Sequence, residues 1–133
     1  MPLIRIDLIQ GRDGAQVDAI GDAVHRAQVE TLGVPERDRF QVINEHAPGR
    51  LVYNPEYLGV ARSDGIVFIQ LFLSAGRTPE VKQAFYARAA ALLAEAGVRR
   101  EDVTICLVEN QRGDWSFGNG VAQYLVMPKE QWK

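Results

Sequence analysis

The sequence lacks the features that would assign it to several broad classes of protein. Its 133 residues include one cysteine, so an internal disulfide is excluded. It has no run of about 18 apolar residues and no secretion signal, so we expect a cytoplasmic protein with no membrane partner. The net charge of −2, from 15 basic and 17 acidic residues, gives no basic field to attract nucleic acid.

The chain is also poor in histidine and cysteine, with two and one respectively. Its two histidines, His25 and His46, lie far apart in the sequence. We expect His25 to be a helix-surface or packing residue rather than a ligand. Cys106 lies in the apolar run VTICLV, which predicts a buried and unreactive thiol. These residues do not show the spacing of a ligand set, so we expect no metal site.

The sequence does contain two similar halves, each with a β-α-β pattern. Gly11-Arg12 matches Gly76-Arg77 at an offset of 65 residues, and Asp38 matches Asp102 at an offset of 64. Such matches indicate a tandem repeat, with units at about 2–46 and 65–110. The expected elements, in chain order, are a strand at 2–9, a helix at 14–32, a strand at 39–46, a strand at 65–74, a helix at 79–96 and a strand at 101–110.

The two predicted helices carry their own boundary signals. Thr78 is a suitable N-cap, Pro79 a suitable first helical residue, and Gly33 and Gly97 suitable C-caps. Apolar residues recur at helical spacing in both, and each stripe is expected to be buried: Val17, Ile20, Val24 and Ala27 in the first helix, and Val81, Phe85, Ala89, Leu92 and Ala96 in the second.

The duplication predicts an α+β fold in a single domain spanning residues 1–133. Each unit makes a parallel strand pair, and two units can merge into a four-stranded mixed sheet with both helices on one face. The run IVFIQLFL is nearly all apolar, which is typical of a strand buried on both sides. We expect a second copy of the chain to cover the free face; the alternative is that the linker at 46–64 folds back over it. The final MPKEQWK reads as a short tail.

Pro2 allows two interpretations. A proline is tolerated at the start of a strand, where its missing amide proton does little harm, so it can be purely structural. If Met1 is removed, however, the ring nitrogen of Pro2 becomes a secondary amine. Such an amine can act as a base, an acid or a nucleophile.

Three features together resemble the tautomerase superfamily. They are the Met-Pro-Leu start in a duplicated β-α-β chain, the motif VPERDRFQV and the motif DWSFGNG. The likeness covers about residues 2–125 and is greatest to the branch that contains malonate semialdehyde decarboxylase. The resemblance implies the fold shared with macrophage migration inhibitory factor, a catalytic Pro2, no cofactor, a small carboxylate substrate and a homotrimer.

The resemblance also implies roles for two charged residues beside Pro2. Arg77 would hold the carboxylate of the substrate, which suits the bidentate geometry of a guanidinium. Asp38, in PERDRF, would assist Pro2 and a water or the substrate. The structural alternatives are an ion pair between Arg77 and Glu80, and a turn or ion-pair role for Asp38. Asp102, the repeat counterpart of Asp38, is expected to be structural.

The aromatic residues of DWSFG, Trp115 and Phe117, resemble the apolar pocket wall of the family. An apolar wall excludes water and strengthens electrostatic interactions inside a site. The alternative is that both are ordinary core residues.

Three functions are compatible with these residues. The first is a tautomerase in which Pro2 is the general base for keto–enol proton transfer on a small 2-oxo acid. The second is a decarboxylase or hydratase of a three-carbon oxo or halo acid that uses protonated Pro2. The decarboxylase pattern carries Arg-x-Arg, whereas the stretch LSAGRT here has one arginine. The third is a trimeric binding protein without catalytic activity.

Overall fold

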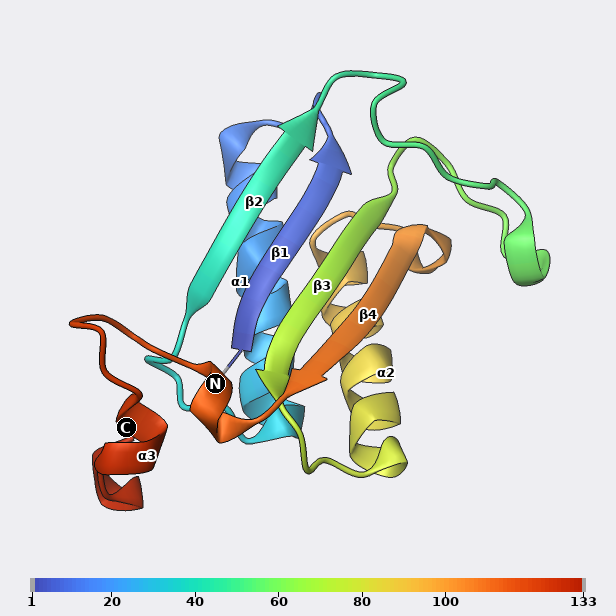
Figure 1. The fold of residues 1–133 in the computed structure, drawn as a ribbon. Coiled ribbons are helices and arrows are strands. Elements are labelled where there is room, and N and C mark those ends of the chain that lie inside the picture. The colour runs from blue at the N-terminus through green and yellow to red at the C-terminus, as the bar shows by residue number, and fades with distance from the viewer. Residues whose placement is uncertain (1, 133) are drawn as a thin grey trace.

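Four strands form one sheet, and two long helices cover one of its faces (Figure 1). The computed structural model describes residues 2–132. The sheet order is β2-β1-β3-β4, with β1 antiparallel to β3 and the two outer pairs parallel. This confirms the predicted α+β architecture. The main elements are β1 (Pro2–Ile9), α1 (Gly14–Leu32), β2 (Phe40–His46), β3 (Val67–Ser74), α2 (Pro79–Glu95) and β4 (Val103–Asn110).

The strand register repeats between the two halves of the chain. Pro2 pairs with Leu73 across the antiparallel centre of the sheet, and Val67 pairs with Leu8 in the same way. Pro2 is the first residue of β1 and Val67 the first residue of β3, and each pairs with the last inward-facing residue of the other strand. Pro2 and Val67 are therefore equivalent positions at opposite ends of the sheet.

The helix boundaries follow from their caps. The Thr78 hydroxyl accepts a hydrogen bond from a backbone N–H of the first turn, and Pro79 opens α2 as expected. Gly33 adopts a left-handed conformation at the end of α1. The prediction of Gly97 as a C-cap is off by one residue, because Ala96 caps α2 and Gly97 follows it with a φ of 88°.

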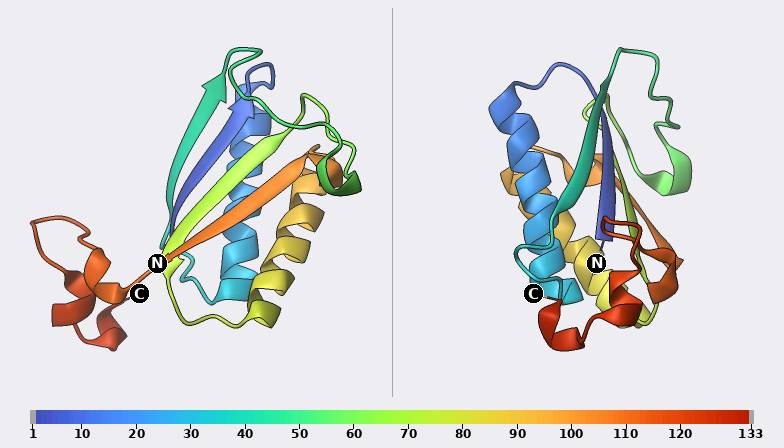
Figure 2. Two further views of the ribbon diagram at one scale, coloured as in Figure 1. Left: turned by 45° about the vertical axis from the view of Figure 1, so that its right-hand side comes forward. Right: turned by 60° about the vertical axis from the view of Figure 1, so that its left-hand side comes forward.

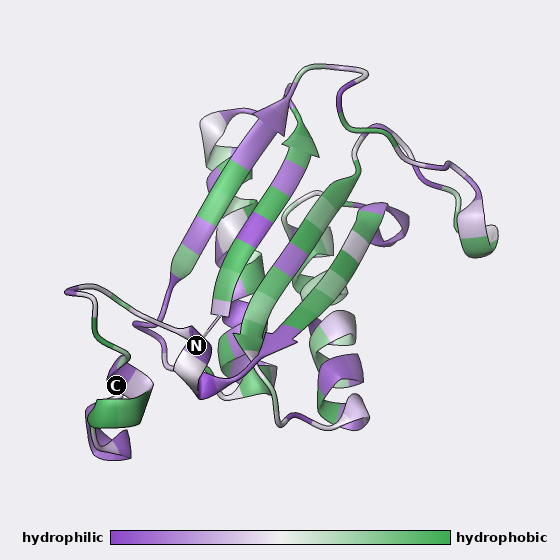
Figure 3. Ribbon diagram, viewed as in Figure 1, coloured by the Kyte–Doolittle hydropathy of each residue, from purple (hydrophilic) through white to green (hydrophobic). Residues whose placement is uncertain are grey.

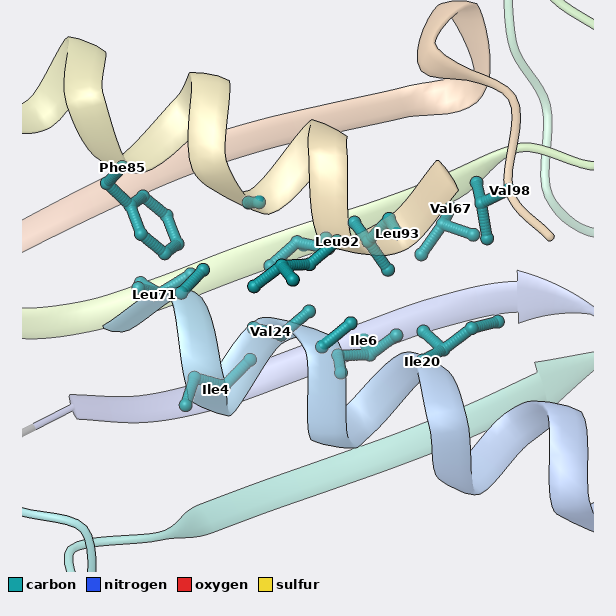
Figure 4. Packing of buried hydrophobic residues seen from close by; sticks show 14 of the residues in the cluster. Ile4, Ile6, Ile20, Val24, Val67, Leu71, Phe85, Leu92, Leu93 and Val98 are labelled. Carbon is teal, nitrogen blue, oxygen red and sulfur yellow. The ribbon is translucent and has the colours of Figure 1, made fainter. Parts of the chain in front are cut away.

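The core lies between the helices and the inner face of the sheet (Figure 4). Alternate residues of β1 and β3 are buried, as a strand with one covered face requires. Each fully buried aliphatic side chain contributes about 1.5–3 kcal/mol relative to exposure. The predicted stripes supply the helical side of this core through six buried residues: Ile20, Val24, Ala27, Phe85, Ala89 and Leu92. The other three stripe residues, Val17, Val81 and Ala96, are only half-buried at its margins.

The outer face of the sheet is open in the single chain. Leu3 and Val42 are 39% and 46% exposed there. Figure 3 views the sheet from this side and shows bands of apolar and polar residues along the strands. The linker does not fold back over it but swings away from the end of β2 (Figure 2). The prediction of a buried Cys106 is also wrong, because Cys106 is paired in register with Gln70 and faces outward on β4.

The C-terminal segment is not a free tail. Residues 112–132 form three short turns, η3 (Arg112–Asp114), α3 (Gln123–Val126) and η4 (Lys129–Gln131), beside the end of the sheet that carries Pro2 (Figure 1). The rings of Tyr124 and Trp132 are in contact, with centroids 4.6 Å apart. Two further short turns are η1 (Tyr57–Gly59) and η2 (Arg100–Asp102). No helix within residues 2–132 is both long enough and apolar enough to cross a membrane.

Candidate active site

Pro2 lies buried at the end of the sheet where β2 begins and β3 ends. The register pairs Pro2 with Leu73 and the next residue, Leu3, with Phe40. The loop into β2 carries Asp38, and the loop out of β3 carries Arg77. The sheet therefore brings three distant parts of the sequence, including the first described residue, to one edge.

A cavity of about 270 Å³ opens at this edge. It is lined by both charged residues that the sequence analysis singled out for the site, together with four residues to which that analysis gave no site role. Its lining includes Asp38, Ser74, Arg77, Arg112, Tyr124 and Trp132. A second cavity of about 230 Å³ shares Asp38, Tyr124 and Trp132 with the first and extends toward Phe40, Phe117 and Met127.

Arg77 has a structural role as well as a place in the cavity. Its Nε and Nη2 donate to the carbonyl of Leu32 at 3.0 and 2.8 Å, and its Nη1 donates to the carbonyl of Ser74 at 3.3 Å. It forms no ion pair with Glu80 within residues 2–132. Burial lowers the pKa of the guanidinium, although Glu109 and Tyr124 oppose this effect. Since a guanidinium has five N–H donors, part of its capacity is left for a ligand.

Gly76 sets the direction of Arg77. Its φ of 132° lies in a region that side chains rarely adopt, and it allows the chain to turn sharply from β3 into α2. The repeat counterpart Gly11 has a φ of 140° and precedes Arg12. The Gly-Arg pairs recognised in the sequence are therefore turn residues with the same backbone shape.

Asp38 is half-buried in the loop before β2. Burial raises the pKa of its carboxyl above the usual range, because a charged carboxylate loses solvation there. Nearby positive charge, including that of His25, opposes this shift. The carboxyl is therefore better able to hold a proton than an exposed aspartate.

Tyr124 is a functional candidate that sequence reasoning missed. Burial and the neighbouring Asp38 raise the pKa of its phenol to about 12, against the opposing effect of Arg77 and Arg112. At neutral pH the hydroxyl is protonated and can donate a hydrogen bond. The sequence analysis interpreted only residues 127–133, which include Trp132, as a tail and gave Tyr124 no role. The available signal was that both aromatic residues follow the DWSFG motif.

Phe117 and Trp115 differ in their contacts. Phe117 lines the second cavity and meets the Tyr124 ring edge-on, with centroids 5.0 Å apart. Trp115 stacks on Phe117 at 5.5 Å, and its indole Nε1 donates to Oδ1 of Asn110 at 2.7 Å. Trp115 thus holds Phe117 in place from the end of β4.

The repeat counterparts of Asp38 and Arg77 lie at the opposite end of the sheet. Asp102 is 1% exposed and accepts hydrogen bonds from the backbone N–H and the hydroxyl of Ser63, at 2.7 and 2.6 Å. Arg12 donates to the carbonyl of Gly65 at 2.7 Å. The structural role expected for Asp102 is confirmed.

The histidines also lie outside the cavities. His25 is 8% exposed and its Nε2 is 2.7 Å from the carbonyl oxygen of Glu36, which confirms a packing role. His46 contacts Asp7 on the outer face, with Nε2 and Oδ1 2.7 Å apart. Across residues 2–132, no group of three His, Cys, Asp or Glu side chains could hold a metal ion.

Comparison with protein families gives a consistent result over nearly the whole chain. A family model described as "Tautomerase enzyme" matches residues 38–118, and another with the same description matches residues 2–61. The chain is 41% identical to the probable tautomerase YusQ of Bacillus subtilis (strain 168), over 94% of this chain and 99% of that protein.

Two solved structures are informative relatives. FG41 malonate semialdehyde decarboxylase, determined with 3-bromopropiolate as inhibitor, is 48% identical with a TM-score of 0.89, over 92% of this chain and 94% of the other. A fused 4-OT described as a symmetric trimer is 25% identical with a TM-score of 0.76, over 93% of this chain and 98% of the other.

Proposed function

This chain belongs to the tautomerase family, and on that premise we propose that it is a cofactor-free tautomerase acting on a small 2-oxo acid. Pro2, freed by removal of Met1, is the general base. Met1 lies outside the described residues, so its removal is a prediction to be checked by the mass of the intact protein. The catalytic partners of Pro2 are Arg77 and Asp38, with Phe117, supported by Trp115, as the apolar wall.

One observation carries this proposal. The strand register brings Pro2 to the same sheet edge as a cavity lined by a carboxyl, two guanidinium groups and a protonated phenol. An α-amine has an ordinary pKa of about 7.7–8.0, so a small bias decides its charge at neutral pH. In the proposed site, burial and the cations of Arg77 and Arg112 would favour the neutral amine, whereas an ionised Asp38 would favour the protonated one.

The reaction needs a single proton shuttle. The neutral nitrogen of Pro2 takes a proton from the carbon beside the substrate carbonyl. The electron pair of that C–H bond forms the C=C bond, and the carbonyl π pair moves to oxygen. The hydroxyl of Tyr124 and the guanidinium of Arg77 stabilise the oxyanion, and Pro2 then returns the proton to this oxygen.

A specific observation favours a second candidate, a decarboxylase or hydratase of a three-carbon oxo or halo acid. The sequence shows one arginine where the decarboxylase pattern has two, but Arg112 enters the same cavity as Arg77 from a distant segment. The 48% identity to FG41 malonate semialdehyde decarboxylase supports this candidate as well. In that reaction a protonated Pro2 would polarise the carbonyl, with Asp38 directing water.

We also propose that the chain acts as one domain and assembles as a homotrimer. The symmetric-trimer description of a relative supports this assembly, as does the open outer face with Leu3, Val42 and Val108 exposed. A trimer would cover the face that the helices leave free.

The pH–rate profile of enol ketonisation tests the role of Pro2. A general base requires the neutral amine, so the rate should fall as the pH drops below neutrality. A decarboxylating Pro2 requires the protonated amine, so its rate should fall as the pH rises. A rate of ketonisation that is lost only above neutrality would reject the general-base proposal.

A further inference from the structure

His25 is a buried histidine that the proposed reaction does not use. It lies on α1, is 8% exposed, and lines neither of the two cavities at the Pro2 end. Its Nε2 lies 2.7 Å from the carbonyl oxygen of Glu36. Because a carbonyl oxygen can only accept a hydrogen bond, Nε2 carries the hydrogen and donates it. This bond ties α1 to the loop that carries Asp38 and leads into β2.

Asp38 ends a tight turn that is tied to α1 on both sides. The backbone N–H of Asp38 donates to the carbonyl of Pro35 at 2.9 Å, which closes the turn. The carbonyl of Glu36, inside the turn, accepts from the imidazole. On the other side of Asp38, Nη1 of Arg39 lies 2.8 Å from Oδ1 of Asp22, which is also on α1. The two ties fix where Asp38 lies relative to the helix.

The two ties differ in their exposure to water. The side chains of Asp22 and Arg39 are 67% and 39% exposed, and surface ion pairs of this kind contribute little. The imidazole of His25 is nearly excluded from water, so water cannot readily replace the bond that it makes to the Glu36 carbonyl. The position of Asp38 therefore depends mainly on the His25 bond.

We propose that His25 is a positioning residue for Asp38: its Nε2–H holds the loop through the Glu36 carbonyl, and its positive charge favours the ionised form of the Asp38 carboxyl. The catalytic consequence rests on the proposed function, in which Asp38 is a partner of Pro2.

The imidazole can act on Asp38 by charge without releasing the loop. Nδ1 of His25 is buried and has no hydrogen-bond partner within residues 2–132, so protonation there leaves the Nε2–H bond in place. The positive charge of the ring opposes the effect of burial, which raises the pKa of the Asp38 carboxyl. The other charged or titratable groups around these two residues are the Asp22–Arg39 pair, the proposed Pro2 amine, Arg37, Arg77, Arg112 and Tyr124. All of them are retained when His25 alone is replaced.

An NMR titration of the Asp38 carboxyl carbon in isotope-labelled protein, assigned with Asp38→Asn, tests the effect of the charge. His25→Gln keeps a side-chain N–H donor and removes the positive charge. Its Asp38 carboxyl should bind a proton about three- to tenfold more tightly than that of the native chain, so the titration midpoint moves to higher pH. An unchanged or weaker proton affinity would overturn the proposal.

Asp22→Asn is the matched control for this titration. It breaks the exposed tie between the same helix and the same loop, one helical turn before His25. The proton affinity of Asp38 should change by less than about twofold in this variant, because the ion pair is exposed to solvent. A shift as large as that in His25→Gln would show that any disturbance of the loop has this effect, and would overturn a specific role of His25.

The kinetics of enol ketonisation test the effect of the hydrogen bond, with kcat compared at the pH optimum of each chain. His25→Leu, or His25→Met if the former does not fold, removes the donor and should lower kcat at least about tenfold, because a displaced catalytic group is costly. KM should stay within about twofold, since Arg77 is untouched. His25→Gln restores a donor and should keep kcat within about threefold of the native value. Native kcat in His25→Leu, or equal losses in the two variants, would overturn the role of the bond.

Failure of this proposal and failure of the proposed function give different results. The titration of Asp38 needs no substrate, so it measures the influence of His25 whatever reaction the chain catalyses. If Pro2→Ala is as active as the native chain, the proposed function fails and the catalytic consequence fails with it. If activity depends on Pro2 but His25→Gln leaves the Asp38 titration unchanged, only the role of His25 is overturned.

Discussion

The two ends of the sheet are built from the same repeated parts and have opposite chemistry. At one end Asp102 and Arg12 are bonded to Ser63 and Gly65, in the segment that leads into β3. At the other end their counterparts, Asp38 and Arg77, line a cavity of about 270 Å³. At the closed end both charged residues bond to the segment that leads into β3. At the open end both line a space that a ligand can enter, and Arg77 also donates to the carbonyls of Leu32 and Ser74.

The difference does not lie in the strands, because the register at the two ends is equivalent. It lies in the segments that flank them. The linker inserts the hydroxyl of Ser63 against Asp102, at 2.6 Å. The segment at 112–132 instead contributes the rings of Tyr124 and Trp132 and the cation of Arg112 to the cavity that Asp38 lines. A duplicated frame thus gives one structural site and one candidate active site.

The largest expected effect comes from the equivalent residues Pro2 and Val67. Pro2→Ala should lower kcat by about 10²–10⁴-fold, because the shuttle loses its secondary amine. Val67→Ala removes a fully buried side chain at the closed end and should cost about 2 kcal/mol of stability while kcat stays within about twofold. Steady-state kinetics and urea unfolding measure the two effects. If Pro2→Ala kept the kcat of the native chain, Pro2 would be no more important for catalysis than Val67, and the contrast between the two ends would be contradicted.

Substitution of the two equivalent aspartates, Asp38 and Asp102, should affect different properties, catalysis in one case and stability in the other. Asp38→Asn should lower kcat about 100-fold, since it removes the titrating carboxyl. Asp102→Asn should spare kcat but cost about 2–4 kcal/mol of stability, because a buried acceptor of two hydrogen bonds is altered.

The pH dependence of stability provides a further check on Asp38. Its pKa is raised in the folded state, so the native protein holds that proton more tightly than the unfolded chain. Stability should therefore fall as the pH rises from the ordinary aspartate range through the raised pKa. Asp38→Asn should remove this decline. If the stability of the native chain instead rose relative to that of Asp38→Asn as the pH increased over this range, the assignment would be contradicted.

The arginine pair should differ less. Arg77→Ala should raise KM about tenfold through loss of carboxylate binding, and should also destabilise the fold because the Leu32 carbonyl loses its donors. Arg12→Ala should cost about 1–2 kcal/mol through the Gly65 carbonyl alone and leave KM unchanged. Substrate titration of both variants beside their thermal unfolding tests this contrast; an equal rise of KM in both would remove it.

The smallest effect is expected at Glu30, which belongs to neither end and joins α1 to α2 through Arg88. This arginine and Arg26 lower the pKa of the Glu30 carboxyl to about 2. Its stabilising contribution should be present above pH 4.5 and should be lost as the pH falls toward about 2. Glu30→Gln should flatten this part of the acid unfolding curve and change little at neutral pH and high salt. A large loss of stability at neutral pH would contradict a surface ion pair.

The sequence was sufficient to predict the repeated frame. Helix α1 begins and ends where the periodicity of Ile20, Val24 and Ala27 and the cap at Gly33 place it, because these signals are local. Asp38 and Arg77 could be nominated from their repeated positions and from a family likeness. That Asp38 and Arg77 line one cavity depends on the strand register, which cannot be predicted from short motifs.

The part of the cavity lining that residues 112–132 supply and the exposure of Cys106 could not be predicted from local patterns. Residues 112–132 have weak helical signals and gain their structure from ring contacts such as Tyr124 with Trp132. The run around Cys106 reads as a buried strand, but β4 has one face that neither helix covers. Both errors arise because packing between distant segments decides burial.

The most direct test of the central claim is covalent labelling of the unblocked Pro2 nitrogen. The purified protein would be incubated with 3-bromopropiolate, and the modified peptide identified by tandem mass spectrometry, with Cys106→Ser as control for the exposed thiol. We expect Met1 to be absent, one label on Pro2 and loss of activity in proportion to labelling, in both the native chain and Cys106→Ser. An active enzyme that retains Met1, or inactivation that follows a label on Cys106, would contradict the account.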